Sequence, residues 1–380
     1  MLVERGAANL RDLRVGLITN PTGLTRELKS TADVLLQAGV KLKALFGPEH
    51  GARGAVQDAI PVEDFVDPRT GVRVHSLYGK TQRPTPAMLR GLDVLVFDIQ
   101  DVGVRFYTYI YTMAYALEAA ASEGLKFIVL DRPNPLNGVI VEGATLDPAF
   151  ASFVGDYELP FRYGLTVGEL ARYLNGTRGW RAALEVVTMD GWRRSMWFDE
   201  TGLPWVMPSP NMPTLETATV YPGTVLFEGT NLSEGRGTCR PFELIGAPWV
   251  SSARLVDALY ENMEAAGVRG ALIREAYFIP TFDKYQGEVC RGVQVHVVDR
   301  SAYEPVKAGV VFLKTLRDLH PEAFQWRRFD DGAYAIDRLA ATDALRTMID
   351  RGAPLDELVA RMAVGADAFA RGRTLYLLYS

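Results

Sequence analysis

The chain has 380 residues, more than one ordinary core holds, so two domains or one large α/β domain are expected. Hydrophobic residues make up 48% of the chain and charged residues 23%, a balance that excludes a disordered protein. The net charge of −5 gives no overall attraction to nucleic acid or to a membrane surface, so the expected partner is a small molecule or the end of a neutral polymer.

Residues 1–17 carry scattered charges and no long apolar run, unlike a signal peptide. No segment approaches the roughly 20 apolar residues that a membrane-spanning helix needs. We therefore expect a cytoplasmic protein, or a secreted or periplasmic one if a leader has been removed.

The first half alternates short apolar runs with helical patterns. Strands are expected at 15–19, 42–46, 72–75, 94–99 and 127–130. Helices are expected from Ser30, which suits an N-cap, from Thr85-Pro86, over 109–123, and over 166–174 behind a capping box. This alternation predicts a parallel sheet with helices on both faces. No GxGxxG follows the first strand, so a dinucleotide site is not expected.

The second half is less regular. Residues 203–248 are rich in Pro, Gly, Thr and Asn and show weak periodicity, which is typical of a long functional loop. Beyond them we expect a helix over 252–266, a strand over 289–298, a helix over 306–319 and a helical tail over 343–370. We place a domain boundary near residue 215, with an N-terminal domain at 1–215 and a C-terminal domain at 216–380.

Polar, Gly- or Pro-shaped loops follow four of the predicted strands. They contain Asn20, Glu49 with His50, Asp98 with Asp101, and Asn134. Since ligands bind outside the carboxyl ends of strands in open α/β sheets, these loops indicate a binding cleft. The alternative is that strand ends simply need turns, which favour the same residues.

The segment 227–243, FEGTNLSEGRGTCRPFE, is the densest polar cluster. Its three glycines permit backbone geometries, or a close approach to a ligand, that a Cβ would block. Glu228, Asn231, Glu234 and Arg236 supply the carboxylates, amide and guanidinium that bind sugars. There is no GxxxxGK[ST], so a P-loop is excluded, whereas an exposed loop without function is the other alternative.

Glu49 is the best single catalytic candidate. It lies in a turn between Pro48 and His50, directly after a buried strand. Partial burial favours the protonated form of a carboxyl group, which suits a general acid. The alternative is a surface glutamate that pairs with Arg53.

Two further groups of polar residues follow predicted strands or lie in turns. Asp98 and Asp101 follow a strand as in haloacid-dehalogenase phosphatases, but that motif separates its aspartates by one residue and here there are two. Asp101 with Arg105 and Tyr107 is expected instead to line a cleft. Asn134 and Asn211, in PNP and SPNMP contexts, are turn residues by default and candidate ligand contacts.

Cysteines and histidines give no sign of metal or redox chemistry. Cys239 and Cys290 form no CxxC pair, and the four histidines show no HExxH or HxH spacing. We therefore expect no metal site and no cofactor.

Several segments together resemble one known family. LFGPEHGARG, DVLVFDIQDVGVRFYTYIYTM, DRPNPLNG, PSPNMPT and YPGTVLFEGTNLSEGRGT occur in the order found in NamZ-type exo-β-N-acetylmuramidases, formerly a domain of unknown function. The resemblance covers nearly the whole chain. It implies a Rossmann-like N-terminal domain, a smaller α+β C-terminal domain, and an active site in the cleft between them. The implied activity is release of N-acetylmuramic acid from the non-reducing end of peptidoglycan fragments.

The resemblance also implies roles for particular residues. The family's catalytic glutamate matches Glu49, and Asp101, Arg105 and Tyr107 are expected in the same cleft. Glu228, Asn231, Glu234 and Arg236 are expected from the glycine-rich segment. We expect Asn20, His50, Asn134 and Asn211 to contact the substrate as well.

The second catalytic group is open at this point. Asp101, Glu228 or Glu234 could act as base or nucleophile, Tyr107 is a further nucleophile candidate, and the substrate's own 2-acetamido oxygen could attack instead. The lactyl carboxylate of the substrate needs a cation, for which Arg105 or Arg236 is expected. The alternative functions are a non-catalytic sugar- or muropeptide-binding protein and a phosphatase-like hydrolase built around Asp98. The oligomeric state is not predicted.

Overall fold

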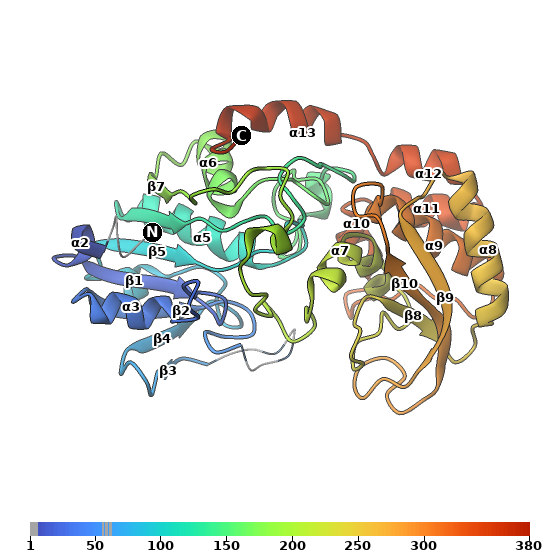
Figure 1. Cartoon of the computed structure of the whole chain (residues 1–380), viewed down its shortest axis with the longest axis horizontal. Helices are drawn as coiled ribbons and strands as arrows, with labels where there is room; N and C mark the ends of the chain where they lie inside the picture. Colours follow the sequence, from blue (N-terminus) through green and yellow to red (C-terminus); the bar gives the residue numbers. More distant parts are fainter. Residues whose placement is uncertain (1–6, 55–56, 58–59, 61–62) are drawn as a thin grey trace.

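The computed structural model describes residues 7–54, 57, 60 and 63–380, and the first six residues, part of the segment expected not to be a leader, lie outside them. Two halves lie side by side, each with its own sheet, and a C-terminal helix crosses from the second half back to the first (Figure 1). No helix among the described residues is both long and apolar enough to cross a membrane.

A seven-stranded sheet forms the first half. Its order is β3-β4-β2-β1-β5-β6-β7, and every neighbouring pair is parallel except β3 with β4. The strands are β1 (Arg14–Thr19), β2 (Lys41–Gly47), β3 (Phe65–Val66), β4 (Arg73–Ser76), β5 (Val94–Asp98), β6 (Lys126–Leu130) and β7 (Ala183–Val187). The five predicted strands are confirmed. Two strands were not predicted: β3, which has two residues, and β7, which lies at the edge and is only partly buried.

Helices cover both faces of this sheet, as predicted. Leu17 and Leu45 face α3 (Thr31–Gln37), whereas Phe46 and Phe97 face the core shared with the two long helices. Those are α5 (Tyr109–Ser122) and α6 (Val167–Arg178), while α2 (Ala7–Leu10), α4 (Pro86–Leu89) and the 3₁₀ turns η1 (Pro148–Phe150) and η2 (Phe198–Thr201) are short. Because both faces are covered, the central strands are apolar throughout.

The predicted helix starts are confirmed. The Ser30 side chain accepts a hydrogen bond from the backbone N–H of Asp33 at the start of α3. Thr166 and Glu169 form the reciprocal capping box at the start of α6, which ends at the left-handed Gly179. Such caps satisfy N–H groups that the first helical turn leaves without partners.

The second half is built on a three-stranded antiparallel sheet of order β8-β10-β9, so the α/β fold with a second, smaller α+β part is confirmed. Its strands are β8 (Leu244–Ala247), β9 (Ala271–Phe278) and β10 (Cys290–Val297). Its helices are α7 (Leu215–Thr224), η3 (Val225–Gly229), α8 (Ser252–Ala265), α9 (Pro305–Leu319), α10 (Ala335–Ala340), α11 (Ala344–Asp350) and α12 (Leu355–Arg361). The last helical segments are α13 (Ala366–Gly372) and η4 (Arg373–Tyr376).

Two expectations for this half were wrong. Residues 203–248 contain α7, η3 and β8, and α7 has no polar face because it is buried on nearly all sides. The single helical tail is three helices, α11 to α13, because Pro354 and the left-handed Gly365 interrupt it.

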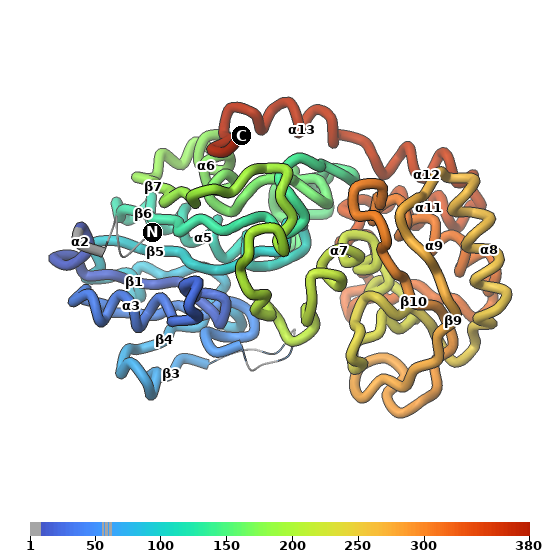
Figure 2. Tube along the Cα trace, in the orientation of Figure 1, coloured from blue at the N-terminus to red at the C-terminus, as the bar shows by residue number. Residues whose placement is uncertain are grey.

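The end of the chain packs on the first half (Figure 2). The buried Arg373 guanidinium donates to Tyr163 O at 2.9 Å and to Val139 O at 2.8 Å. Tyr379 Oη donates to Asp131 Oδ2 at 2.6 Å. The last residues therefore help to build the half that begins the chain, while the division at residue 215 stays a prediction.

Candidate functional site

A cleft of about 390 Å³ lies at the carboxyl ends of the first sheet's strands, where the two halves meet. This volume is in the range of small-molecule sites. Its walls come from the loops after β2, β4, β5, β6 and β7, and from the second half. Lining residues are Glu49, His50, Tyr78, Gln82, Phe106, Tyr107, Thr108, Tyr109, Ser152, Phe153, Val154, Ser209, Asn211, Met212, Tyr221, Glu228, Arg236, Phe242, Arg327, Phe329, Ala335, Arg338 and Leu339.

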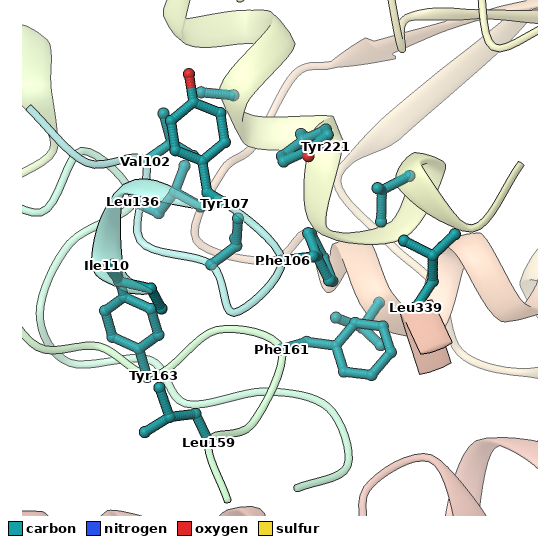
Figure 3. Packing of buried hydrophobic residues seen from close by; sticks show 14 of the residues in the cluster. Val102, Phe106, Tyr107, Ile110, Leu136, Leu159, Phe161, Tyr163, Tyr221 and Leu339 are labelled. Atoms are coloured by element: carbon teal, nitrogen blue, oxygen red, sulfur yellow. The ribbon is translucent and has the colours of Figure 1, made fainter. Parts of the chain in front are cut away.

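Aromatic side chains of the two halves pack against one another at this cleft (Figure 3). Phe106, from the loop after β5, packs edge-on against Phe161 and against Tyr221 of α7, with ring centroids 5.4 Å apart in both pairs. Tyr107 packs edge-on against Tyr109 at 4.9 Å. Edge-to-face pairs of this kind add packing energy beyond the area they bury, and of these three the Phe106–Tyr221 pair joins the two halves.

Glu49 is half-buried in the turn after β2 and lines the cleft. Its Oε2 accepts a hydrogen bond from Thr108 Oγ1 at 2.7 Å. The next residue, His50, is buried and takes a left-handed backbone conformation with φ of 68°. The structure thus brings Glu49 and His50 into the same cleft as the glycine-rich segment.

Within the glycine-rich segment, Arg236 lies between two carboxylates. Its Nη2 donates to Glu228 Oε1 at 2.7 Å, and its Nε lies 3.2 Å from Glu234 Oε1. Glu234 is buried and also pairs with Lys284 Nζ at 2.8 Å. Glu228 and Arg236 line the cleft. Glu234 and Lys284 are not among the cleft residues, and Glu234 holds Arg236 through their ion pair.

The pKa values of Glu228 and Glu234 are shifted in opposite directions. Burial raises the pKa of Glu228, although Arg236 opposes the shift. Burial acts on Glu234 in the same direction, but Lys284 and Arg236 together outweigh it and lower the pKa of Glu234. Glu228 is thus the carboxyl group of this pair that more readily holds a proton.

Two glycines of this segment are required by contacts within the protein, whereas the predicted close approach to a ligand stays a prediction. A Cβ on Gly229 would lie 2.7 Å from the backbone of Ile336 in α10, so the close approach of η3 and α10 requires glycine. Gly237 has φ of 77° and packs against the backbone of Phe282, which excludes a side chain for two reasons.

Asp101 is placed away from the cleft lining. Its Oδ2 accepts hydrogen bonds from Gly103 N at 2.7 Å and from Tyr163 Oη, and these bonds shape the loop after β5. Burial raises the pKa of Asp101 to about 6. The geometry supports a structural role and not the predicted catalytic one.

Arg105 is also absent from the cleft lining. The fully buried guanidinium donates to the carbonyl oxygens of Ala144, Leu159 and Leu339 at 2.9, 3.0 and 2.9 Å. Burial lowers the pKa of Arg105 to about 10. The expectation that it binds the substrate's carboxylate has no support in this geometry.

The predicted asparagines are used in different ways. Asn134 Nδ2 donates to Leu165 O at 2.9 Å, and Asn231 Nδ2 donates to Ala323 O at 2.8 Å, so both fasten loops. Asn20 Oδ1 accepts from Thr22 N at 2.9 Å within its own turn. Among the four, Asn211 lines the cleft.

Asp98 is buried in the sheet and pairs with Arg132 Nε at 2.6 Å. It is not among the cleft residues, and this gives no support to the phosphatase alternative. Within residues 7–54, 57, 60 and 63–380, no group of three or more His, Cys, Asp and Glu side chains is arranged to hold a metal ion.

Two arginines of the cleft were not predicted from the sequence. Arg327, Phe329 and Arg338 come from the segment around α10, more than 90 positions after the glycine-rich block begins. No motif marks them, because only the packing of α10 against η3 brings them to the first half's loops. The one local pattern that could have indicated them is the run Trp326-Arg327-Arg328-Phe329, in which two arginines lie between two aromatic residues.

Fold and cleft together define a two-lobed α/β protein whose interlobe cleft holds two carboxyl groups and several arginines. Comparison with known proteins shows which family of this class the chain belongs to. A family model for the N-terminal part of the exo-β-N-acetylmuramidase NamZ matches residues 15–216, and one for its C-terminal part matches residues 219–379. The chain belongs to the NamZ family.

Three similar proteins were found in these comparisons. The peptidoglycan β-N-acetylmuramidase NamZ of Bacillus subtilis (strain 168) is 50% identical over 371 residues, which are 97% of this chain and 88% of that protein. A DUF1343 family protein of Bacteroides fragilis NCTC 9343 has a crystal structure that is 37% identical, with a TM-score of 0.90 and coverage of 100% and 97% of the two chains. A second from the same organism is 29% identical, with a TM-score of 0.76 and coverage of 100% and 98%.

Proposed function

We propose that this protein is a glycoside hydrolase that releases N-acetylmuramic acid from the non-reducing end of peptidoglycan fragments. The observation that carries the proposal is the position of Glu49 and Glu228 in one cleft, on opposite halves of a NamZ-family chain. Glycoside hydrolysis usually needs two such groups, one at the leaving oxygen and one at the anomeric carbon.

Glu49 is the proposed general acid. Partial burial and the hydrogen bond from Thr108 hold its carboxyl group in one orientation at the cleft wall. Its proton passes to the glycosidic oxygen as the bond from the anomeric carbon to that oxygen breaks, and a water molecule supplies the hydroxyl group of the released sugar.

Glu228 is the proposed second group. It lines the cleft and is held by Arg236, so its carboxylate is oriented before the substrate arrives. It acts either at the anomeric carbon through water or by orienting the substrate's 2-acetamido group. Tyr107 also lines the cleft, but burial raises its pKa well above the ordinary value, which disfavours a tyrosinate nucleophile.

The test is hydrolysis of 4-nitrophenyl β-N-acetylmuraminide, together with a proton NMR time course on the disaccharide of N-acetylmuramic acid and N-acetylglucosamine. We expect free N-acetylmuramic acid as the first product, and the anomer seen first reports retention or inversion. Binding of the disaccharide without turnover would favour a non-catalytic sugar-binding protein instead. The predicted cytoplasmic location belongs to the same proposal and is checked by cell fractionation.

A further inference from the structure

Three arginines among the described residues line the cleft, and their partners differ. Arg236 is held by Glu228 and Glu234, so its charge is balanced inside the protein. Arg327 and Arg338 come from the segment 327–338 and line the same cleft. The charge available to an anionic ligand is therefore on these two residues.

Arg327 has a fixed backbone and an available guanidinium. Its N–H donates to Gly229 O at 2.9 Å, and its carbonyl oxygen accepts from Ala335 N at 3.0 Å. The guanidinium carbon lies 5.9 Å from the ring centroid of Phe329. Across the described part of the chain, no carboxylate forms an ion pair with Arg327, whose side chain is exposed.

Arg338 projects from α10 and lies over the same ring. Its guanidinium carbon lies 4.2 Å from the Phe329 centroid, close enough for a cation–π contact. Its Nη2 pairs with Asp331 Oδ2 at 2.9 Å, but the Asp331 side chain is 60% exposed. Because an exposed ion pair of this kind contributes little, Asp331 can release Arg338 to a ligand.

Backbone hydrogen bonds support the segment that carries both arginines. Phe329, whose exposed fraction is 36%, lies in a hairpin closed by its N–H to Ala333 O and by Gly332 N to Phe329 O, both at 2.9 Å. The hairpin leads directly into α10, which packs on Gly229 and accepts the Arg105 hydrogen bond at Leu339 O. A rigid support lowers the conformational entropy lost when a ligand binds.

We propose that Arg327 and Arg338, whose guanidinium groups both lie near the Phe329 ring, form the subsite that binds the lactyl carboxylate of N-acetylmuramic acid and so distinguish it from N-acetylglucosamine. The inference rests on the proposed function. Guanidinium groups match carboxylates with paired N–H donors, and the aromatic ring keeps both groups at the wall of the cleft. These residues replace Arg105 and Arg236, which the sequence indicated for this task.

The experiment compares Arg327→Gln, Arg338→Gln and the matched control Arg328→Gln. The control residue is in the same hairpin, but its guanidinium stacks on Tyr334 and it does not line the cleft. For each protein, kcat/KM is measured on the 4-nitrophenyl β-glycosides of N-acetylmuramic acid and N-acetylglucosamine. Calorimetry measures binding of free N-acetylmuramic acid and of its lactyl methyl ester.

We expect Arg327→Gln and Arg338→Gln each to lower kcat/KM on the muramic substrate by about 10–100-fold, chiefly through KM, as loss of a charge-assisted hydrogen bond does. Both substitutions should leave kcat/KM on the glucosamine substrate unchanged, and Arg328→Gln should leave kcat/KM unchanged on both substrates. The methyl ester should bind the native protein more weakly than the acid. Equal losses on both substrates, or an unchanged ratio, would overturn the proposal.

The calorimetric measurement distinguishes failure of the proposed hydrolase activity from failure of the proposed carboxylate subsite. If the native protein binds N-acetylmuramic acid in preference to its ester but hydrolyses neither glycoside, the proposed activity fails and the carboxylate subsite stands. If the native protein hydrolyses the muramic glycoside and both variants keep its preference, the activity stands and the subsite is wrong.

Discussion

The hydroxyl of Thr108 donates a hydrogen bond to Oε2 of Glu49 at 2.7 Å. The two residues come from the loops after β5 and β2, which lie on either side of β1 in the sheet. A single bond thus couples two loops that are almost 60 positions apart in sequence, and it fixes the orientation of the proposed acid.

Replacing Glu49 by Gln removes the proton donor while it preserves the size of the side chain. We expect kcat on the natural disaccharide to fall by about 10²–10⁴-fold, the usual contribution of a positioned general acid. The decrease should be smaller on the 4-nitrophenyl substrate, whose leaving group needs less protonation. Glu63→Gln is the control, since Glu63 is exposed and paired with Lys80, and equal activity of both variants would refute the role of Glu49.

Thr108→Val should leave the fold intact and release Glu49 from its fixed orientation. We expect kcat/KM to fall by about tenfold, because a hydrogen bond to a carboxylate contributes roughly 1.5–3 kcal/mol and part of it is regained from water. Thr108→Ser retains the hydroxyl and should restore most of the activity. A valine variant as active as the native enzyme would show that this bond does not position the acid.

Glu228 and Glu234 both contact Arg236, yet their substitutions should have different effects. Glu228→Gln should lower kcat by about 10²–10⁴-fold with little loss of stability, since the residue faces the cleft. Glu234→Gln should chiefly lower the free energy of unfolding, because it leaves the buried Lys284 and Arg236 without their shared carboxylate. Urea unfolding and steady-state kinetics on both variants separate these outcomes.

Asp101 should make the stability depend on pH. Burial raises its pKa to about 6 from an ordinary value of 3.8, although Tyr163 and Gly103 oppose the shift. The folded state therefore keeps this proton to a higher pH than the unfolded state does. Its stabilising contribution is complete below about pH 4 and is lost as the pH rises through about 6.

The Asp101→Asn variant cannot titrate at this position and isolates the effect. We expect the free energy of unfolding of the native protein, relative to the variant, to decrease by up to about 3 kcal/mol between about pH 4 and pH 7. Urea unfolding at several pH values measures it, and other titrating groups cancel in the difference. Parallel curves for the two proteins would contradict the assignment.

Arg105→Met should destabilise the protein rather than impair recognition of the substrate. The change leaves three buried carbonyl oxygens without their donor, which costs on the order of 3 kcal/mol in unfolding free energy. Arg90→Met, at an exposed position, is the control. A stable Arg105→Met protein that has lost its preference for the muramic substrate would instead restore the predicted binding role.

The sequence predicted the parallel sheet well because its strands are buried on both faces and read as continuous apolar runs. Helix starts such as those at Ser30 and Thr166 were predicted equally well, because caps are local interactions. By contrast, α7 was missed, since complete burial removes the polar-apolar periodicity by which a helix is recognised. The edge strand β7 was missed because its residues are only partly buried.

For the candidate site, the sequence by itself singled out Glu49, Glu228 and Arg236, and these three residues line one cleft. It did not separate them from Asp101, Arg105 and Asn134, because a polar residue that fastens a loop and one that faces a ligand have the same local context. Only the tertiary structure decided this, through the direction of each side chain and the packing of α10 on η3. That packing also brought Arg327 and Arg338 to the cleft, a contact between distant segments that no local pattern encodes.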